Sequence, residues 1–234
     1  MNTKHRMVVI PIAFLCILAM QEVLMPSDLR ATLKNESVEL PEVSAGRDQT
    51  FVDLMYERRS VRRFAPGEIT LQHLANILFA AQGITRQNRF RTVPSAGALY
   101  PLEVYVVSGA VQGLADGVYA YRPQGHELIQ VASGDLRQDL ARHCYGQMWV
   151  AQAQAVVVIN AVYSRVTGKY GGRGERYAHI EAGCAAQNMS LAGYNLGLGS
   201  TVVGAFHDTE VADLVQAGKG EVPLIVMPVG RLDE

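Results

Sequence analysis

Apolar residues recur at helical spacing in three stretches of this chain. Thr70 can cap a helix whose apolar residues fall on one face, and Gly83 is placed to end it. Those apolar residues are Leu71, Leu74, Ile77, Leu78 and Ala81. The pattern also predicts a short helix over Phe51–Arg59 and a long one over Arg176–Leu196, in which several neighbouring residues are small enough for close packing.

Other stretches are β-branched or alternate between apolar and polar residues, as strands do. Such patterns predict strands over 102–108, 117–122, 128–132, 155–162 and 224–229. The run at 155–162 is the most apolar, which is typical of a central strand buried on both faces. Long helices mixed with such strands predict an α+β fold, in which helices flank a mixed or antiparallel sheet.

The N-terminus differs from the rest. Lys4, His5 and Arg6 precede an uncharged run from Met7 to Met20, which is the form of an export signal and is short for a membrane span. We expect residues 1–25 to be an export signal or a membrane anchor, and the protein to be exported, periplasmic or membrane-anchored. The alternative is a hydrophobic arm packed on a cytoplasmic domain.

The remaining chain divides by composition. Residues 26–48 mix proline, glycine and polar residues, which predicts a linker with little structure of its own. Residues 49–234 then form a single domain. With 49% hydrophobic and 18% charged residues the chain is a folded protein.

Charge and motif content exclude several classes of function. A net charge of −1 provides no general field for nucleic acid, so an anion site has to be local. The three cysteines lack metal-ligand spacing, and we expect no metal site. The sequence holds no phosphate-binding loop and no dinucleotide fingerprint between a strand and a helix.

Two stretches carry candidate chemistry. Arg58, Arg59, Ser60 and Arg62 place three guanidinium groups and a hydroxyl within five residues, and such charges repel one another unless an anion lies among them. The second stretch, residues 94–101, is a loop of small residues between two prolines. It would allow the backbone to approach a flat ligand closely.

The order of these motifs resembles the FMN-dependent nitroreductase superfamily, and within it the SagB-type dehydrogenase branch. The resemblance covers the chain from about residue 38 to its end. It is carried by residues 57–64, 74–83, 94–101, 117–121, 176–183, 186–188, 197–199 and 228–231. It implies a nitroreductase-like fold and an intertwined homodimer.

The resemblance also implies a flavin site. Arg58 and Ser60 would hold the FMN phosphate together with Arg231, with Arg59 close by, and Arg62 would reach the ribityl chain and the N1/C2 edge of the ring. Backbone near N5 would come from Val203, Gly204 and Ala205, where Gly204 replaces an acidic residue of some relatives. The other flavin contacts implied are Gln187 and, from the second subunit, Pro94, Ser95, Ala96 and Gly97.

The expected reaction is two-electron transfer through the flavin N5, with NAD(P)H as electron donor and a small molecule or peptide as substrate. Lys169 and Tyr170 are candidates for proton transfer, although charged and tyrosine residues before a helix are more often surface and packing groups. The alternative function is a non-catalytic or degenerate flavin-binding protein, associated with a membrane through its N-terminus and serving a partner complex.

Overall fold

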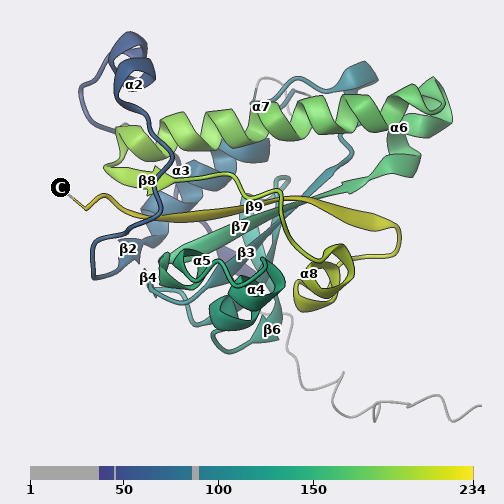
Figure 1. Ribbon diagram of the computed structural model, residues 1–234. Coiled ribbons are helices and arrows are strands. Elements are labelled where there is room, and N and C mark those ends of the chain that lie inside the picture. Colours follow the sequence, from purple (N-terminus) through teal and green to yellow (C-terminus); the bar gives the residue numbers. More distant parts are fainter. Residues whose placement is uncertain (1–36, 45, 86–89, 234) are drawn as a thin grey trace, which may run out of the picture. The chain divides into compact units, whose positions relative to one another are not determined.

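The computed structural model describes residues 37–44, 46–85 and 90–233 (Figure 1). The segment expected to direct export or anchoring, residues 1–25, lies outside the described residues. In the part that is described, no helix combines the length and the apolar character that crossing a bilayer requires.

Seven strands form one sheet in which every neighbouring pair is antiparallel. Their order is β1-β6-β5-β3-β7-β9-β8. The strands are β1 (Ser37–Glu39), β3 (Leu102–Ser108), β5 (Gly117–Arg122), β6 (Glu127–Ser133), β7 (Ala155–Val162), β8 (Leu198–Ser200) and β9 (Glu221–Arg231). The short strands β2 (Ile69–Thr70) and β4 (Val111–Gln112) pair in parallel beside it.

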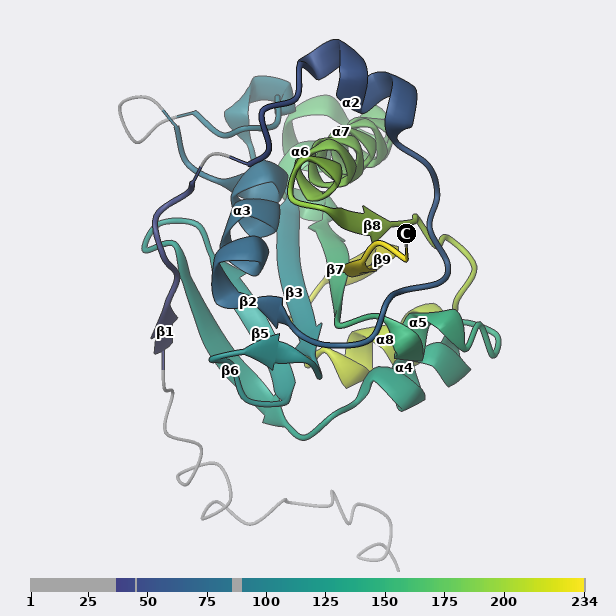
Figure 2. The same cartoon turned by 90° about the vertical axis from the view of Figure 1, so that its left-hand side faces the viewer.

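Helices cover both faces of this sheet (Figure 2). On one face α3 (Leu71–Gln82) and α7 (Arg173–Asn195) share a core with the sheet, and on the other face α4 (Arg137–His143), α5 (Trp149–Gln152) and α8 (Asp208–Leu214) share a second core. Two further helices, α2 (Phe51–Glu57) and α6 (Tyr163–Tyr170), contact α7. The predicted α+β fold with a helix-flanked sheet is therefore confirmed.

Strand β7 shows why the sheet needs both layers. Its residues alternate between the two cores, with Val157 and Ile159 in one and Val156 and Val158 in the other, and all four are fully buried. At about 1.5–3 kcal/mol for each buried valine or isoleucine, this strand alone contributes substantially to stability. The predicted central strand is confirmed.

A capping box fixes the start of α3, and small residues allow α7 to pack closely. The Thr70 hydroxyl accepts from the His73 N–H at 3.1 Å, and the His73 ring accepts from the Thr70 N–H at 3.3 Å, which closes a capping box. Helix α7 buries its small residues, including Ala178, Ala182 and Ala185, against the core. The close contact of α3 with α7 follows from these small side chains.

One expectation from the sequence was wrong in part, and one helix was not predicted. The expected linker over 26–48 is not without structure in its described portion, because Ser37–Glu39 pairs with β6 and the Arg47 N–H donates to the Asn195 carbonyl at 2.9 Å. Helix α6, which ends at Lys169 and Tyr170, was not predicted.

Candidate functional site

A cleft of about 250 Å³ lies where the segment after α2 passes α7 and the end of β8. It is lined by Arg58, Ser60, Arg62, Gly183, Ala186, Gln187, Ser190, Ser200, Thr201, Val202, Ile225 and Met227. Four residues that the sequence singles out, three from one motif and one from α7, are therefore brought to one place. We call this the arginine cleft.

The arginine motif reaches the cleft because α2 stops just before it. Helix α2 ends at Glu57, and Arg58 leaves the helical conformation while its N–H still donates to the Leu54 carbonyl at 3.0 Å. The chain then becomes extended, and the Val61 N–H donates to the Ser200 carbonyl at 2.9 Å. This bond fixes Ser60 beside the end of β8.

The three arginines of the motif have different surroundings. The Arg58 and Arg62 side chains line the cleft, and the Arg62 guanidinium lies 5.5 Å from the centre of the Trp149 ring. Arg59 turns back to its own backbone, since its Nη1 donates to the carbonyls of Tyr56 at 2.5 Å and Arg58 at 2.9 Å. In this arrangement the Arg59 side chain does not line the cleft, so the expected contact with a cofactor would require it to turn.

Helix α7 provides the floor of the cleft. Gly183, Ala186, Gln187 and Ser190 are three, four and seven residues apart, so they lie on one helix face. Gly183 and Ala186 leave room for a ligand, while the exposed Gln187 offers an amide. Small residues at helical spacing therefore leave space for the cleft on one face of a helix that is otherwise closely packed.

Three hydroxyl groups were missed by the sequence reasoning. Ser190, Ser200 and Thr201 line the cleft and are 8%, 4% and 4% exposed. The only signals were that Ser190 lies three residues after Gln187 on the same helix, and that Ser200 and Thr201 follow the Gly197–Gly199 turn. Neither signal distinguishes a binding hydroxyl from a surface one.

Arg231 lines a neighbouring cleft together with Arg47, Glu68 and His73. On β9 it is two residues beyond Val229, the strand partner of the cleft-lining Ser200, which is about 7 Å along a strand. Arg231 and burial together lower the pKa of His73, with burial the larger cause. The expectation that Arg231 joins Arg58 and Ser60 stays a prediction, since in this arrangement its side chain lines the neighbouring cleft.

The backbone expected near the flavin ring lies beside the cleft. Val203 is buried and pairs with Val226, whose carbonyl accepts from the Val203 N–H at 2.8 Å. Gly204 and Ala205 are exposed, and the Ala205 carbonyl accepts from Gln147 Nε2 at 3.3 Å. Because Thr201 and Val202 line the cleft directly, this segment could contribute backbone groups to a ligand.

A second group of residues gathers at the opposite end of α7. Gly97, in the 3₁₀ turn Ala96–Ala98, has a φ of 62°, and a Cβ placed on it would lie 2.7 Å from the Tyr170 hydroxyl and 3.0 Å from Lys169 Nζ. The loop that also holds Pro94 and Ser95 therefore lies against the two candidates for proton transfer. A side chain at this position would displace the ends of Tyr170 and Lys169 and would be strained by the left-handed backbone.

The 94–97 loop and the arginine cleft lie on different faces of α7. Ser95 lies beside Glu181, whose pKa its side chain lowers, and Glu181 is two residues before the cleft-lining Gly183. Two residues turn an α-helix by about 200°, so Glu181 and Gly183 point in nearly opposite directions. Helix α7 therefore separates the loop from the arginine cleft of its own chain.

The donor set of the arginine cleft suits a phosphorylated, polyhydroxylated cofactor such as FMN. Two guanidinium groups and the Ser60 hydroxyl suit a phosphate, and the buried hydroxyls suit a sugar chain. Apolar Ile225 and Met227 suit the face of a ring. Among the described residues, no group of three or more His, Cys, Asp or Glu side chains could hold a metal ion.

Comparison with known proteins agrees with these observations. The family model described as the Nitroreductase family matches residues 55–231. A Methanocaldococcus jannaschii protein named as a nitroreductase is 43% identical over 194 residues, which are 83% of this chain and 96% of the relative. The microcin B17-processing protein McbC of Escherichia coli is 31% identical over 151 residues, which are 62% of this chain and only 55% of McbC.

Solved structures show the same fold. A structure from Ralstonia eutropha, described as that of a nitroreductase, has a TM-score of 0.74 and 27% sequence identity. The match covers 86% of this chain and 92% of the other.

Proposed function

Because this chain belongs to the nitroreductase family of oxidoreductases, we propose that it binds FMN in the arginine cleft and catalyses two-electron transfer. The observation that carries the proposal is the meeting of Arg58, Ser60 and Arg62 with the polar face of α7. When bound, FMN supplies the hydride chemistry at its N5. The protein's part is to bind and orient it.

Each residue of the cleft has a role in this proposal. Arg58 and Ser60 bind the phosphate, since charge-assisted donors are the strongest partners for it. Arg62 and Gln187 face the ribityl chain and the polar edge of the ring, where a fixed positive charge favours the reduced, anionic form. Backbone from Thr201 to Gly204 contacts the ring near N5.

We also propose a homodimer in which each copy completes the site of the other. Helix α7 exposes a stripe at helical spacing with Ile180, 59% exposed, at its centre, and α2 beside it exposes Phe51, Met55 and Tyr56. Exposed apolar side chains grouped in this way mark interfaces. A two-fold axis near Ile180 would place Arg173 of one copy opposite Gln187 of the other.

Such a dimer would bring the 94–97 loop to the cleft face of α7, from which the helix separates it within one chain. The loop 94–97 of one copy, with Lys169 and Tyr170 behind it, would cover the arginine cleft of the other. A cleft of about 250 Å³ is also small for a cofactor site, because pockets for small molecules are commonly about 300–1,000 Å³. The second copy would supply the missing wall.

Lys169 and Tyr170 are then placed to move a proton at the substrate. The exposed Lys169 Nζ lies 5.4 Å from the centre of the Tyr170 ring, and both groups adjoin Gly97. We propose NAD(P)H as the electron donor and a small molecule or a peptide as the substrate. The similarity to McbC, a processing protein for microcin B17, supports a SagB-type dehydrogenase and keeps peptides among the substrates to test.

A second candidate function rests on the apolar run Met7–Met20, which lies outside the described residues. A flavin-binding protein without turnover could use this run for export or membrane association and serve a partner complex. Fractionation of cells producing the full chain tests the location.

The proposed function is tested by mixing the purified full chain, loaded with FMN, anaerobically with NADH or NADPH. We expect the flavin absorbance to bleach with one of the two and to return on adding an acceptor. A flavin that no nicotinamide and no candidate substrate reduces would contradict the proposal and favour the second candidate.

A further inference from the structure

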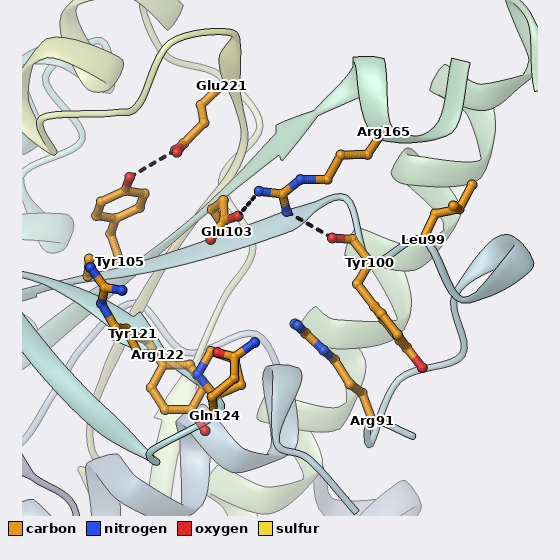
Figure 3. Close-up of a pocket in the computed structure, with 12 residues that line it drawn as sticks. Arg91, Leu99, Tyr100, Glu103, Tyr105, Tyr121, Arg122, Gln124, Arg165 and Glu221 are labelled. Carbon is orange, nitrogen blue, oxygen red and sulfur yellow. Dashed lines mark hydrogen bonds and ion pairs between the residues drawn. The ribbon is translucent and has the colours of Figure 1, made fainter. Parts of the chain in front are cut away.

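A larger cavity, of about 550 Å³, lies away from the arginine cleft, where strands β3 and β5 separate (Figure 3). These strands pair from Tyr105–Ala120 to Ser108–Gly117. Residues 102–104 of β3 and 121–122 of β5 lie outside this ladder, although β3 continues to pair with β7 and β5 with β6. The sheet therefore divides at one end, and side chains of both strands line the space.

Three arginines from separate segments line this cavity. Arg165 is neutralised by an ion pair with Glu103, and its Nη1 donates to the Tyr100 carbonyl at 3.0 Å. Among the described residues, neither of the other two, Arg91 and Arg122, has a carboxylate in ion-pair contact. Within the part of the chain that the structure describes, neither of these two guanidinium groups is therefore neutralised by a carboxylate in contact with it.

The carboxylate that remains in the cavity is already engaged. Glu221 accepts from the Tyr105 hydroxyl at 2.9 Å and from Asn160 Nδ2 at 3.1 Å. Burial and this carboxylate together raise the pKa of Tyr105, so the phenol stays protonated and continues to donate. Among the described residues Glu221 therefore pairs with neutral donors and not with Arg91 or Arg122.

Arg91 is held in one orientation. Its Nη1 donates to Gln82 Oε1 at 2.6 Å, and Gln82 is fully buried. Its guanidinium carbon lies 4.6 Å from the centre of the Tyr100 ring, which covers one face of the group. Glu103 and Glu181 lie close enough to act on it electrostatically, with Glu103 the larger influence.

The contacts of Arg91 with Gln82 and Tyr100 limit the direction from which a ligand can approach its guanidinium group. With one face covered by Tyr100 and one nitrogen bound to Gln82, Arg91 offers its remaining N–H groups in the plane of the guanidinium. A planar carboxylate is the acceptor that this in-plane edge fits best. Tyrosine side chains around the cavity favour a ligand whose acid is joined to a flat ring.

We propose that this cavity is a binding site for a carboxylate carried on an aromatic or otherwise flat ligand, with Arg91 as its main receptor and Arg122 as the outer one. The site is distinct from the arginine cleft and does not depend on flavin chemistry. It adjoins the 94–101 loop through Leu99 and Tyr100, so an occupant would lie against the loop proposed to cover the flavin of a second copy.

The test uses the full chain without added FMN and the fluorescent probe 2-naphthoate, with its neutral isostere 2-naphthamide. We expect 2-naphthoate to bind at least about tenfold more tightly than 2-naphthamide, because a charged hydrogen bond to Arg91 is lost in the amide. R91K, which keeps the charge but not the planar edge, is expected to weaken 2-naphthoate about tenfold. Equal affinity for the two probes, or no binding of either, would overturn the proposal.

Two further variants locate the binding. R122Q changes an exposed side chain, cannot disturb the core, and should weaken the probe severalfold. R58A, in the arginine cleft, should leave its affinity unchanged. A loss in R58A with none in R91K and R122Q would assign the acid to the arginine cleft and contradict a second site, and thermal unfolding shows whether R91K remains folded.

Discussion

The separation of Arg58 from Arg231 gives a sharp prediction. Arg58 lines the arginine cleft, whereas Arg231 lines a neighbouring cleft. If Arg58 holds the FMN phosphate, Arg58→Ala removes a charge-assisted contact, which is about 1.5–3 kcal/mol. The Kd for FMN should then rise about 10- to 150-fold, and Arg231→Ala should change it less than about threefold.

The assay is the quenching of FMN fluorescence on titration with each apo variant, at one salt concentration because phosphate contacts are screened. The backbone of Arg58 closes α2 through its N–H, which alanine retains, so the fold should survive the change. Circular dichroism checks this. Equal losses in the two variants would refute the placement of Arg231, and no loss in Arg58→Ala would refute the phosphate site.

Three other predictions follow from particular contacts. Ile180→Glu places a charge at the centre of the proposed interface. Light scattering should then show monomers, and kinetic assays should show little turnover. Tyr145→Glu, at an exposed tyrosine outside that interface, should change neither result. Gly97→Val places a branched side chain against Tyr170 at a backbone φ of 62°. The variant should have a free energy of unfolding in urea about 1–3 kcal/mol lower, and a lower turnover. An unchanged free energy of unfolding would contradict the close packing of Gly97 against Tyr170. Burial raises the pKa of Glu181, so the folded state binds the carboxyl proton more tightly than the unfolded state does. The free energy of unfolding should therefore fall as pH rises through the range between the pKa values of Glu181 in the unfolded and folded states. Glu181→Gln should remove that fall in urea titrations between pH 4 and 8, and a fall that persists in the variant would point to another group.

The elements that the sequence predicts well are those whose pattern and packing agree. Helix α3 has an apolar face, a capping threonine and a glycine at its end, and it forms over Leu71–Gln82. Helix α6 could not be predicted, because it is eight residues long, contains a glycine and buries only Val166 fully. Such a helix exists because it packs against α7.

The candidate site was predicted in its parts but not in its assembly. Arg58, Ser60 and Arg62 share one motif, and the structure does bring Gln187 to them. Where Arg231 lies depends on the pairing of β9 with β8, in which it faces Leu198 beyond the cleft. Register between strands is a tertiary property that one sequence does not reveal.

The most direct test of the central claim is the visible absorption spectrum of the purified full chain after incubation with FMN and removal of the excess. We expect a flavin spectrum with about one FMN per chain, because each arginine cleft offers one set of phosphate donors. A protein that is folded and dimeric but retains no flavin would contradict the claim that this cleft is an FMN site.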